Sequence, residues 1–184
     1  MNLHPISAAH WPEVRAIYVE GIATEQATFA TEPPSWDAWD AGHLPTCRLM
    51  AVADATTGTG LGWAALSPVS GRCVYAGVAE VSVYVAAAAR GRGVGRALLL
   101  ALVAASEQLG LWTLQASIFS ENTPSLRLHK SAGFRQVGRR ERIGQLRGVW
   151  RDTLLLERRS AAVGVDILTG AATLIASSEN HATA

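Results

Sequence analysis

The sequence predicts an α+β fold built on a mixed, mostly antiparallel sheet, and three observations support it. Residues 79–86 read AEVSVYVA, in which valines alternate with polar side chains as in a half-buried strand. A glycine-rich turn then leads into residues 96–110, which are good helix formers throughout, and Gly110 is placed to end that helix. Strand candidates at residues 47–53 and 61–66 flank the turn TTGTG and predict a hairpin.

The remaining elements are predicted from local start and stop signals. Ser7 can cap a helix over residues 8–20, where apolar side chains recur near helical spacing, and Ser35 can cap a second, short helix. Asn122-Thr123-Pro124 is a capped helix start with proline in the tolerated first turn, and Gly133 ends that helix. Further strands are predicted at residues 3–6, 112–118, 134–138 and 150–157.

The length of the chain predicts one domain. Its 184 residues are 49% hydrophobic, which is enough to bury a core. We place the domain at residues 1–160 and treat residues 161–184 as a C-terminal extension of unknown role, because the composition there fits no defined element. The extension is expected to be untethered, as chain ends commonly are, with packing against the domain or a partner subunit as the alternative.

Charge and cysteine content favour a small-molecule partner. The 16 Lys and Arg residues balance 15 Asp and Glu, so the chain offers no strong attraction for nucleic acid or an anionic membrane. Cys47 and Cys73 have neither metal-ligand nor disulfide-framework spacing, so no metal is expected and a reducing cytoplasm fits. The start MNLHPISAAHWPEV does not read as a secretory signal, and the longest apolar run, residues 97–105, is far shorter than the ~20 residues of a membrane span.

Residues 90–96, RGRGVGR, have the features of a phosphate cradle. Free amides of the turn and of the first helical turn could bind a pyrophosphate, aided by the helix dipole. Glycines let phosphates approach the backbone, and the arginines add charge. A P-loop is excluded because no Gly-Lys-Ser/Thr follows, and a dinucleotide fingerprint because Arg96 replaces its last glycine. Coenzyme A is the cofactor that remains, with a simple tight turn as the alternative.

Two motifs in the observed order resemble those of the GNAT superfamily. Arg90-x-x-Gly93-x-Gly95 after a strand matches its acetyl-CoA motif, and Asn122-x-x-Ser125-x-x-x-His129-x-x-x-Gly133-Phe134 follows in the expected place. The wider match, residues 17–157, is similar to the phosphinothricin acetyltransferase branch. It includes the segments ATFATEPP, GWAALSPV, EVSVYV, ENTPSLRLH and GVWRDTLLLER.

The resemblance implies a GNAT fold, with helices on both faces of a sheet that splays where acetyl-CoA enters. It implies that the backbone of Val83, Tyr84 and Val85 binds the pantetheine arm. The pyrophosphate would be held by Gly91, Arg92, Gly93, Val94, Gly95 and Arg96, with Arg90 adding charge. Asn122 would bond the cofactor from the opposite side, with Ser125 in the same motif. The branch also implies a homodimer.

Two residues are expected to carry acyl transfer. A base must take a proton from the acceptor amine, and the departing thiolate benefits from a proton donor. Glu80 occupies the position of the catalytic glutamate in the resembled branch; a surface glutamate, or one paired with Arg72 or Arg142, is the alternative. His129 lies where many superfamily members carry a proton-donating tyrosine, and imidazole titrates near neutrality. A histidine without a chemical role is the alternative there.

The branch implies a glutamate-like substrate: phosphinothricin, methionine sulfoximine or arsinothricin, acetylated on the α-amine and thereby detoxified. Arg72 precedes the Glu80 strand and could bind a substrate carboxylate bidentately. Tyr75 and Phe29 could wall the site. A protein N-terminus or a polyamine as acceptor, and a non-catalytic CoA-binding sensor, are the alternative functions.

Overall fold

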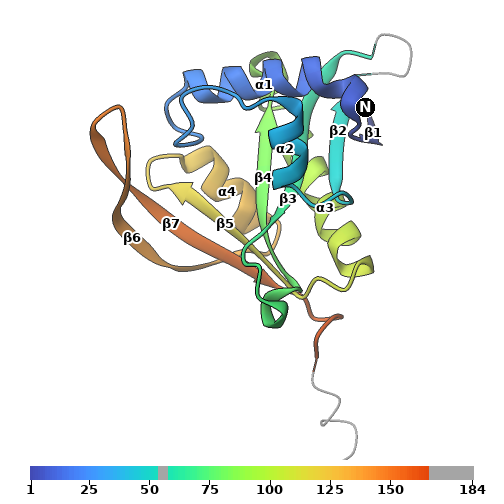
Figure 1. Cartoon of the computed structure of the whole chain (residues 1–184), viewed down its shortest axis with the longest axis vertical. Helices are drawn as coiled ribbons and strands as arrows, with labels where there is room; N and C mark the ends of the chain where they lie inside the picture. Colours follow the sequence, from blue (N-terminus) through green and yellow to red (C-terminus); the bar gives the residue numbers. More distant parts are fainter. Residues whose placement is uncertain (54–57, 166–184) are drawn as a thin grey trace, which may run out of the picture.

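The computed structural model describes residues 1–53 and 58–165, and in them it contains one seven-stranded sheet in the order β1-β2-β3-β4-β5-β7-β6 (Figure 1). Only β4 and β5 run parallel; every other neighbouring pair is antiparallel. The predicted α+β fold with a mixed sheet is confirmed. The strands are β1 Asn2–Pro5, β2 Arg48–Val52, β3 Gly60–Pro68, β4 Val78–Val85, β5 Thr113–Phe119, β6 Arg135–Leu146 and β7 Val149–Arg159.

Helices cover both faces of this sheet, as predicted. They are α1 Trp11–Ala23, α2 Trp36–Gly42, α3 Val94–Gln108 and α4 Thr123–Ser131. Strand β3 shows the two layers, because its side chains alternate between two cores. Ala64 and Leu66 lie in the core that contains the buried leucines of α3, and Trp63 and Ala65 lie in the core formed with α1 and α2.

Strands β4 and β5 diverge after a short paired region. They pair at Val78, Ala79 and Glu80, whereas β4 stays paired with β3 as far as Val85. The backbone groups of residues 81–85 that face β5 therefore have no strand partner in the described part of the chain. The predicted splay is confirmed, and it opens the sheet beside Glu80.

The last two strands are longer than the predicted 134–138 and 150–157. Most of β6 is exposed, so the buried alternation that marks a strand in a sequence is absent there. Its register with β7 shifts at two places, between Gln136 and Gly138 and between Arg140 and Gly144. The hairpin turns through Arg147 and Gly148, both with positive φ (48° and 81°). Such a two-residue turn matches the twist of the strands it joins.

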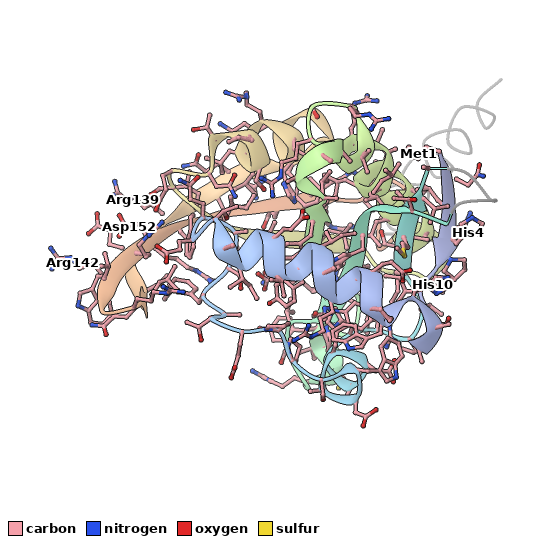
Figure 2. All side chains as sticks on the ribbon, turned by 90° about the horizontal axis from the view of Figure 1, so that it is seen from above. Met1, His4, His10, Arg139, Arg142 and Asp152 are labelled. Carbon is pink, nitrogen blue, oxygen red and sulfur yellow. The ribbon has the colours of Figure 1, made fainter. Side chains whose placement is uncertain are left out.

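This hairpin, β6–β7, projects from the body of the molecule (Figure 1). Figure 2 shows its residues Arg139, Arg142 and Asp152 at the end opposite Met1, His4 and His10.

The ends of the domain also differ from expectation. The helix predicted over 8–20 is a 3-10 turn at Ala8–His10 followed by α1, because Pro12 lies in the first turn of α1 and starts a new helix there. Beyond β7, the Arg159 guanidinium donates to the carbonyls of Trp112 and Val163 at 2.9 and 2.6 Å, which holds the first residues after the strand to the domain. Residues 166–184 of the predicted extension lie outside the described residues, so the division at 160 stays a prediction.

Candidate active site

A cavity of about 880 Å³ fills the splay between β4 and β5. Its walls come from those two strands, the start of α3, helix α4 and the loop after α1. Most of the residues singled out from the sequence line it: Phe29, Glu80, Val83, Tyr84, Val85, Arg90, Gly91, Gly93, Val94, Gly95, Arg96, Asn122, Ser125 and His129. Arg92, Arg72 and Tyr75 are exposed and do not. Fourteen of these seventeen residues, from four separate segments of the chain, are thus brought to one cavity.

The phosphate turn, residues 90–96, joins β4 to α3 through two glycines in the left-handed region. Gly91 has φ 75° and Gly93, the N-cap of α3, has φ 81°. Apart from the adjoining residues of the chain, no atom of the described residues lies within 4 Å of where a Cβ at either position would stand. Gly95 is different, because a Cβ there would lie 3.2 Å from Leu128 and 3.3 Å from Val85. Two glycines therefore keep the turn open, and one allows close packing.

Charges around this turn suit a phosphate. Arg90 and Arg96 line the cavity, and the Arg90 Nε donates to the Val85 carbonyl at 3.3 Å. The Glu20 carboxylate of α1 accepts a hydrogen bond from the Ala87 amide at 2.6 Å, which fixes the chain just before the turn. The free amides at the start of α3 complete an anion-binding site, so the residues present fit a pyrophosphate.

Glu80 lies at the point where β4 and β5 separate, half-buried in the cavity wall. Its Oε2 accepts a hydrogen bond from the Gln115 Nε2 at 3.1 Å, and its Oε1 accepts one from the Ser117 amide at 3.3 Å. Both donors are on β5, and neither Arg72 nor Arg142, the partners considered from the sequence, bonds to Glu80 among the described residues. The two donors restrain both oxygens of the carboxylate and so fix its orientation at the cavity wall.

His129 is 3% exposed, on α4. Its Nδ1 lies 2.9 Å from the Ser125 carbonyl, and because a carbonyl can only accept, Nδ1 carries the proton. Its Nε2 is buried and has no hydrogen-bond partner among the described residues. Burial lowers the pKa of His129 below its ordinary value of 6.5, partly offset by the bond to Ser125. The ring is therefore neutral at pH 7, and Nε2 has no proton to donate.

Asn122 uses both ends of its side-chain amide within the protein. Its Oδ1 caps α4 by accepting from the Ser125 amide at 3.2 Å, and its Nδ2 donates to the Gln26 carbonyl at 2.9 Å. The second bond ties the loop after α1 to α4. Asn122 therefore lines the cavity, but its side-chain amide is already engaged within the protein, and its predicted bond to the cofactor stays a prediction.

The same loop is held by the β6–β7 hairpin. Arg151 donates to the Glu25 carbonyl at 3.2 Å, forms an ion pair with Glu121, and stacks 4.8 Å from the centre of the Phe119 ring. Phe29 packs edge-on against Phe119, with ring centres 4.7 Å apart. A Cβ at Gly144 would come within 3.0 Å of Phe29. We call these contacts of residues 24–30 with α4 and the hairpin the loop clamp.

Arg72 and Tyr75 lie away from the cavity, unlike Phe29. They flank a short 3-10 turn, Cys73–Tyr75, and the Arg72 guanidinium stacks 5.7 Å from the Tyr75 ring. Tyr75 is 45% exposed. The chain turns outward before β4, so proximity to Glu80 in sequence does not bring Arg72 to the cavity wall of this chain.

Four polar residues near the cavity were missed in the sequence: Gln115, Ser117, Arg151 and Thr153. Ser117 and Thr153 line the cavity, and the buried Thr153 hydroxyl has no partner among the described residues. A signal existed for Gln115 and Ser117, since polar residues alternate with apolar ones in the strand WTLQASI and so share one face. Nothing local marked Arg151 and Thr153, because β7 reaches the cavity through long-range pairing with β5.

Residues 1–53 and 58–165 contain no cluster of three or more His, Cys, Asp or Glu side chains able to hold a metal ion. Within the same ranges, no helix combines the length and apolarity needed to cross a bilayer.

Comparisons with known proteins agree with this geometry. The profile of the acetyltransferase (GNAT) family matches residues 11–134. A phosphinothricin N-acetyltransferase from Alcaligenes faecalis is 40% identical over 157 residues, covering 80% of this chain and 76% of that protein. An L-methionine sulfoximine/L-methionine sulfone acetyltransferase from Pseudomonas paraeruginosa is 30% identical over 162 residues, covering 85% and 92%. The crystal structure of a phosphinothricin acetyltransferase from Sinorhizobium meliloti in complex with acetyl-CoA has a TM-score of 0.79 at 28% identity, covering 89% and 90%.

Proposed function

Because the chain belongs to the GNAT acetyltransferase family, and is thus an acetyl-CoA-dependent N-acetyltransferase, we propose that it acetylates the α-amine of a small glutamate analogue. Substrates of this type are phosphinothricin, methionine sulfoximine and arsinothricin, and acetylation would detoxify them and confer resistance. The relatives named for the first two support this substrate class. The observation that carries the proposal is that Glu80 and the phosphate turn line one cavity.

The cofactor would be held along β4 and the phosphate turn. The backbone of Val83, Tyr84 and Val85 would bind the pantetheine arm on the side that β5 has left free. The pyrophosphate would lie against the amides of Gly91, Gly93, Val94 and Gly95, with Arg90 and Arg96 supplying charge. Arg92 is exposed beside the turn and would meet an outer phosphate, and Asn122 and Ser125 would border the arm at the start of α4. Acetyl-CoA supplies the thioester that the acceptor amine attacks.

Glu80 would act as the general base. An α-ammonium group has no lone pair, so the carboxylate must take one proton, directly or through water, before the amine can attack. His129 fits the role of thiolate proton donor less well, because its proton is on Nδ1 and bonded to Ser125. We propose that His129 supports α4 beside the cavity as a neutral ring.

Phe29 would wall the substrate region. Arg72 and Tyr75 are exposed, and they would contribute to substrate binding through the assembled homodimer. A second copy of the chain would dock on the β6–β7 hairpin, which carries four exposed apolar side chains: Val137, Ile143, Val149 and Trp150 are 46–58% exposed. A cytoplasmic location would fit the use of acetyl-CoA and the free thiols of Cys47 and Cys73.

A thiol-release assay tests the proposal. Wild type should release coenzyme A with at least one member of a panel of glutamate analogues, and Glu80→Gln should lower kcat by about 10²–10⁴-fold while acetyl-CoA binding by calorimetry persists. Glu13→Gln, which removes an exposed carboxylate on α1, should match wild type.

Each alternative function predicts a different result in this assay. Turnover of an N-terminal peptide or a polyamine, but of no amino acid, would replace the substrate class. Full activity of Glu80→Gln would remove the base assignment, and acetyl-CoA binding without turnover of any amine would indicate a sensor.

A further inference from the structure

A row of polar side chains crosses the sheet at the level of Glu80. In register, Glu80 on β4 pairs with Gln115 on β5, Gln115 pairs with Glu157 on β7, and Glu157 pairs with Arg135 on β6. Residues that pair directly across neighbouring strands project from the same face. The row therefore places one amide, Gln115, between two carboxylates.

The two carboxylates have different partners. Gln115 Nε2 donates to Glu80 Oε2 at 3.1 Å, whereas Glu157 forms an ion pair with Arg135. An ionised carboxylate can only accept hydrogen bonds, so each of the two neighbours of Gln115 needs a donor. The NH₂ group is at one end of the Gln115 amide and points to one of the two carboxylates. Because Arg135 neutralises Glu157, the donor end of Gln115 is left for Glu80.

We propose that Gln115 is a positioning residue for Glu80: its amide donor fixes one carboxylate oxygen and so orients the base at the point where the strands separate. The inference rests on the proposed function, in which Glu80 is the base. The Ser117 amide holds the other oxygen and cannot be removed by changing a side chain. Of the two hydrogen bonds that restrain Glu80, the one from Gln115 is therefore the one that a side-chain substitution can remove.

Other charged groups bear on Glu80 less directly. On the sheet, the groups that face it are Ser67 of β3, which is neutral, and the Glu157–Arg135 pair beyond Gln115. The remaining titratable residues that line the cavity are Tyr84, Arg90, Arg96 and His129. Of these, Tyr84 stays protonated because burial raises its pKa, and His129 stays neutral because burial lowers its pKa. Replacing Gln115 with a charged residue is therefore the most direct way to change the electrostatic surroundings of the Glu80 carboxylate.

The test is the pH profile of kcat/KM with the amino acid and acetyl-CoA. In Gln115→Glu, a second carboxylate beside Glu80 favours protonation, so the acidic limb should move up by about one pH unit, and kcat/KM measured below the wild-type limb should fall about tenfold. In Gln115→Met, loss of the donor should move the limb in the same direction by less. Both variants should approach the wild-type rate at high pH.

Controls separate this role from a structural one and from failure of the proposed function. Gln136→Glu adds the same charge at an exposed position of β6 and should leave the limb unchanged. A lower melting temperature in the Gln115 variants with an unmoved limb would overturn the positioning role. If Glu80→Gln keeps full activity, the proposed base is wrong; if it is inactive and Gln115→Glu has the wild-type limb, the positioning inference alone is wrong.

Discussion

The phosphate turn and the loop clamp line the same cavity, but the chain builds them in opposite ways. The turn is seven consecutive residues whose shape is set by its own glycines and by the helix it starts. The clamp joins residues 96 positions apart, Gln26 and Asn122, and 126 positions apart, Glu25 and Arg151. A site built from consecutive residues should be most sensitive to substitutions that change its backbone geometry. A site built from distant segments should be most sensitive to the loss of single side-chain contacts.

The largest effect is expected in the phosphate turn, from Gly93→Ala. A non-glycine residue in the left-handed region costs roughly 1 kcal/mol, and the new methyl group would enter the space that the phosphate needs. We expect affinity for acetyl-CoA, measured by calorimetry, to fall at least tenfold. Gly110→Ala is the matched control, since Gly110 has a similar φ of 77° and equally open surroundings but ends α3 away from the cavity. It should lower stability and leave acetyl-CoA affinity intact; equal losses of affinity in both would contradict a special role for the turn.

The next effect is expected at the loop clamp, from Asn122→Asp. Aspartate caps a helix as well as asparagine does, so α4 should keep its start, but the donor to the Gln26 carbonyl is lost and a carboxylate faces that carbonyl. We expect KM to rise about fivefold with little change in melting temperature, together with faster hydrogen exchange in residues 24–30. Asn122→Ser keeps a cap without the repulsion and should give a smaller rise. Unchanged exchange in both variants would show that this bond does not hold the loop.

The same contrast explains what could be predicted from the sequence. Residues 90–96 and the 122–133 segment were placed correctly because glycines, caps and proline act within a few residues of their own position. Arg72 was chosen for its nearness to Glu80 along the chain, yet a 3-10 turn carries it outward. Gln115 and Arg151 reach their partners through strand pairing, and no local pattern encodes the register of β5 with β4 or of β7 with β5.

A smaller effect is expected from Arg151→Met. The methionine keeps an apolar chain over Phe119 but loses the ion pair with Glu121 and the bond to Glu25. Since Arg151 is 19% exposed and Glu121 is 40% exposed, solvent weakens the pair, and we expect about 1 kcal/mol of lost stability in urea unfolding. A double-mutant cycle with Glu121→Gln should show coupling. Arg139→Met, which breaks the more exposed pair with Asp152 on the same hairpin, should cost less; the reverse order would argue against the clamp.

The smallest effect is expected in the pH dependence of stability, at the buried His129 of α4. The folded-state pKa of His129 lies below 6.5, so between that value and 6.5 the unfolded chain binds more protons than the folded one. The contribution of His129 to the free energy of unfolding is therefore fully present above about pH 6.5. It falls as the pH drops, by at most about 1.4 kcal/mol per pH unit. His129→Asn keeps a donor for the Ser125 carbonyl without a titrating ring, so its loss of stability between pH 7.5 and 5 should be shallower. His4→Asn, at an exposed position of β1, should follow the wild-type curve, and a parallel curve for His129→Asn would show that the buried ring does not titrate on unfolding.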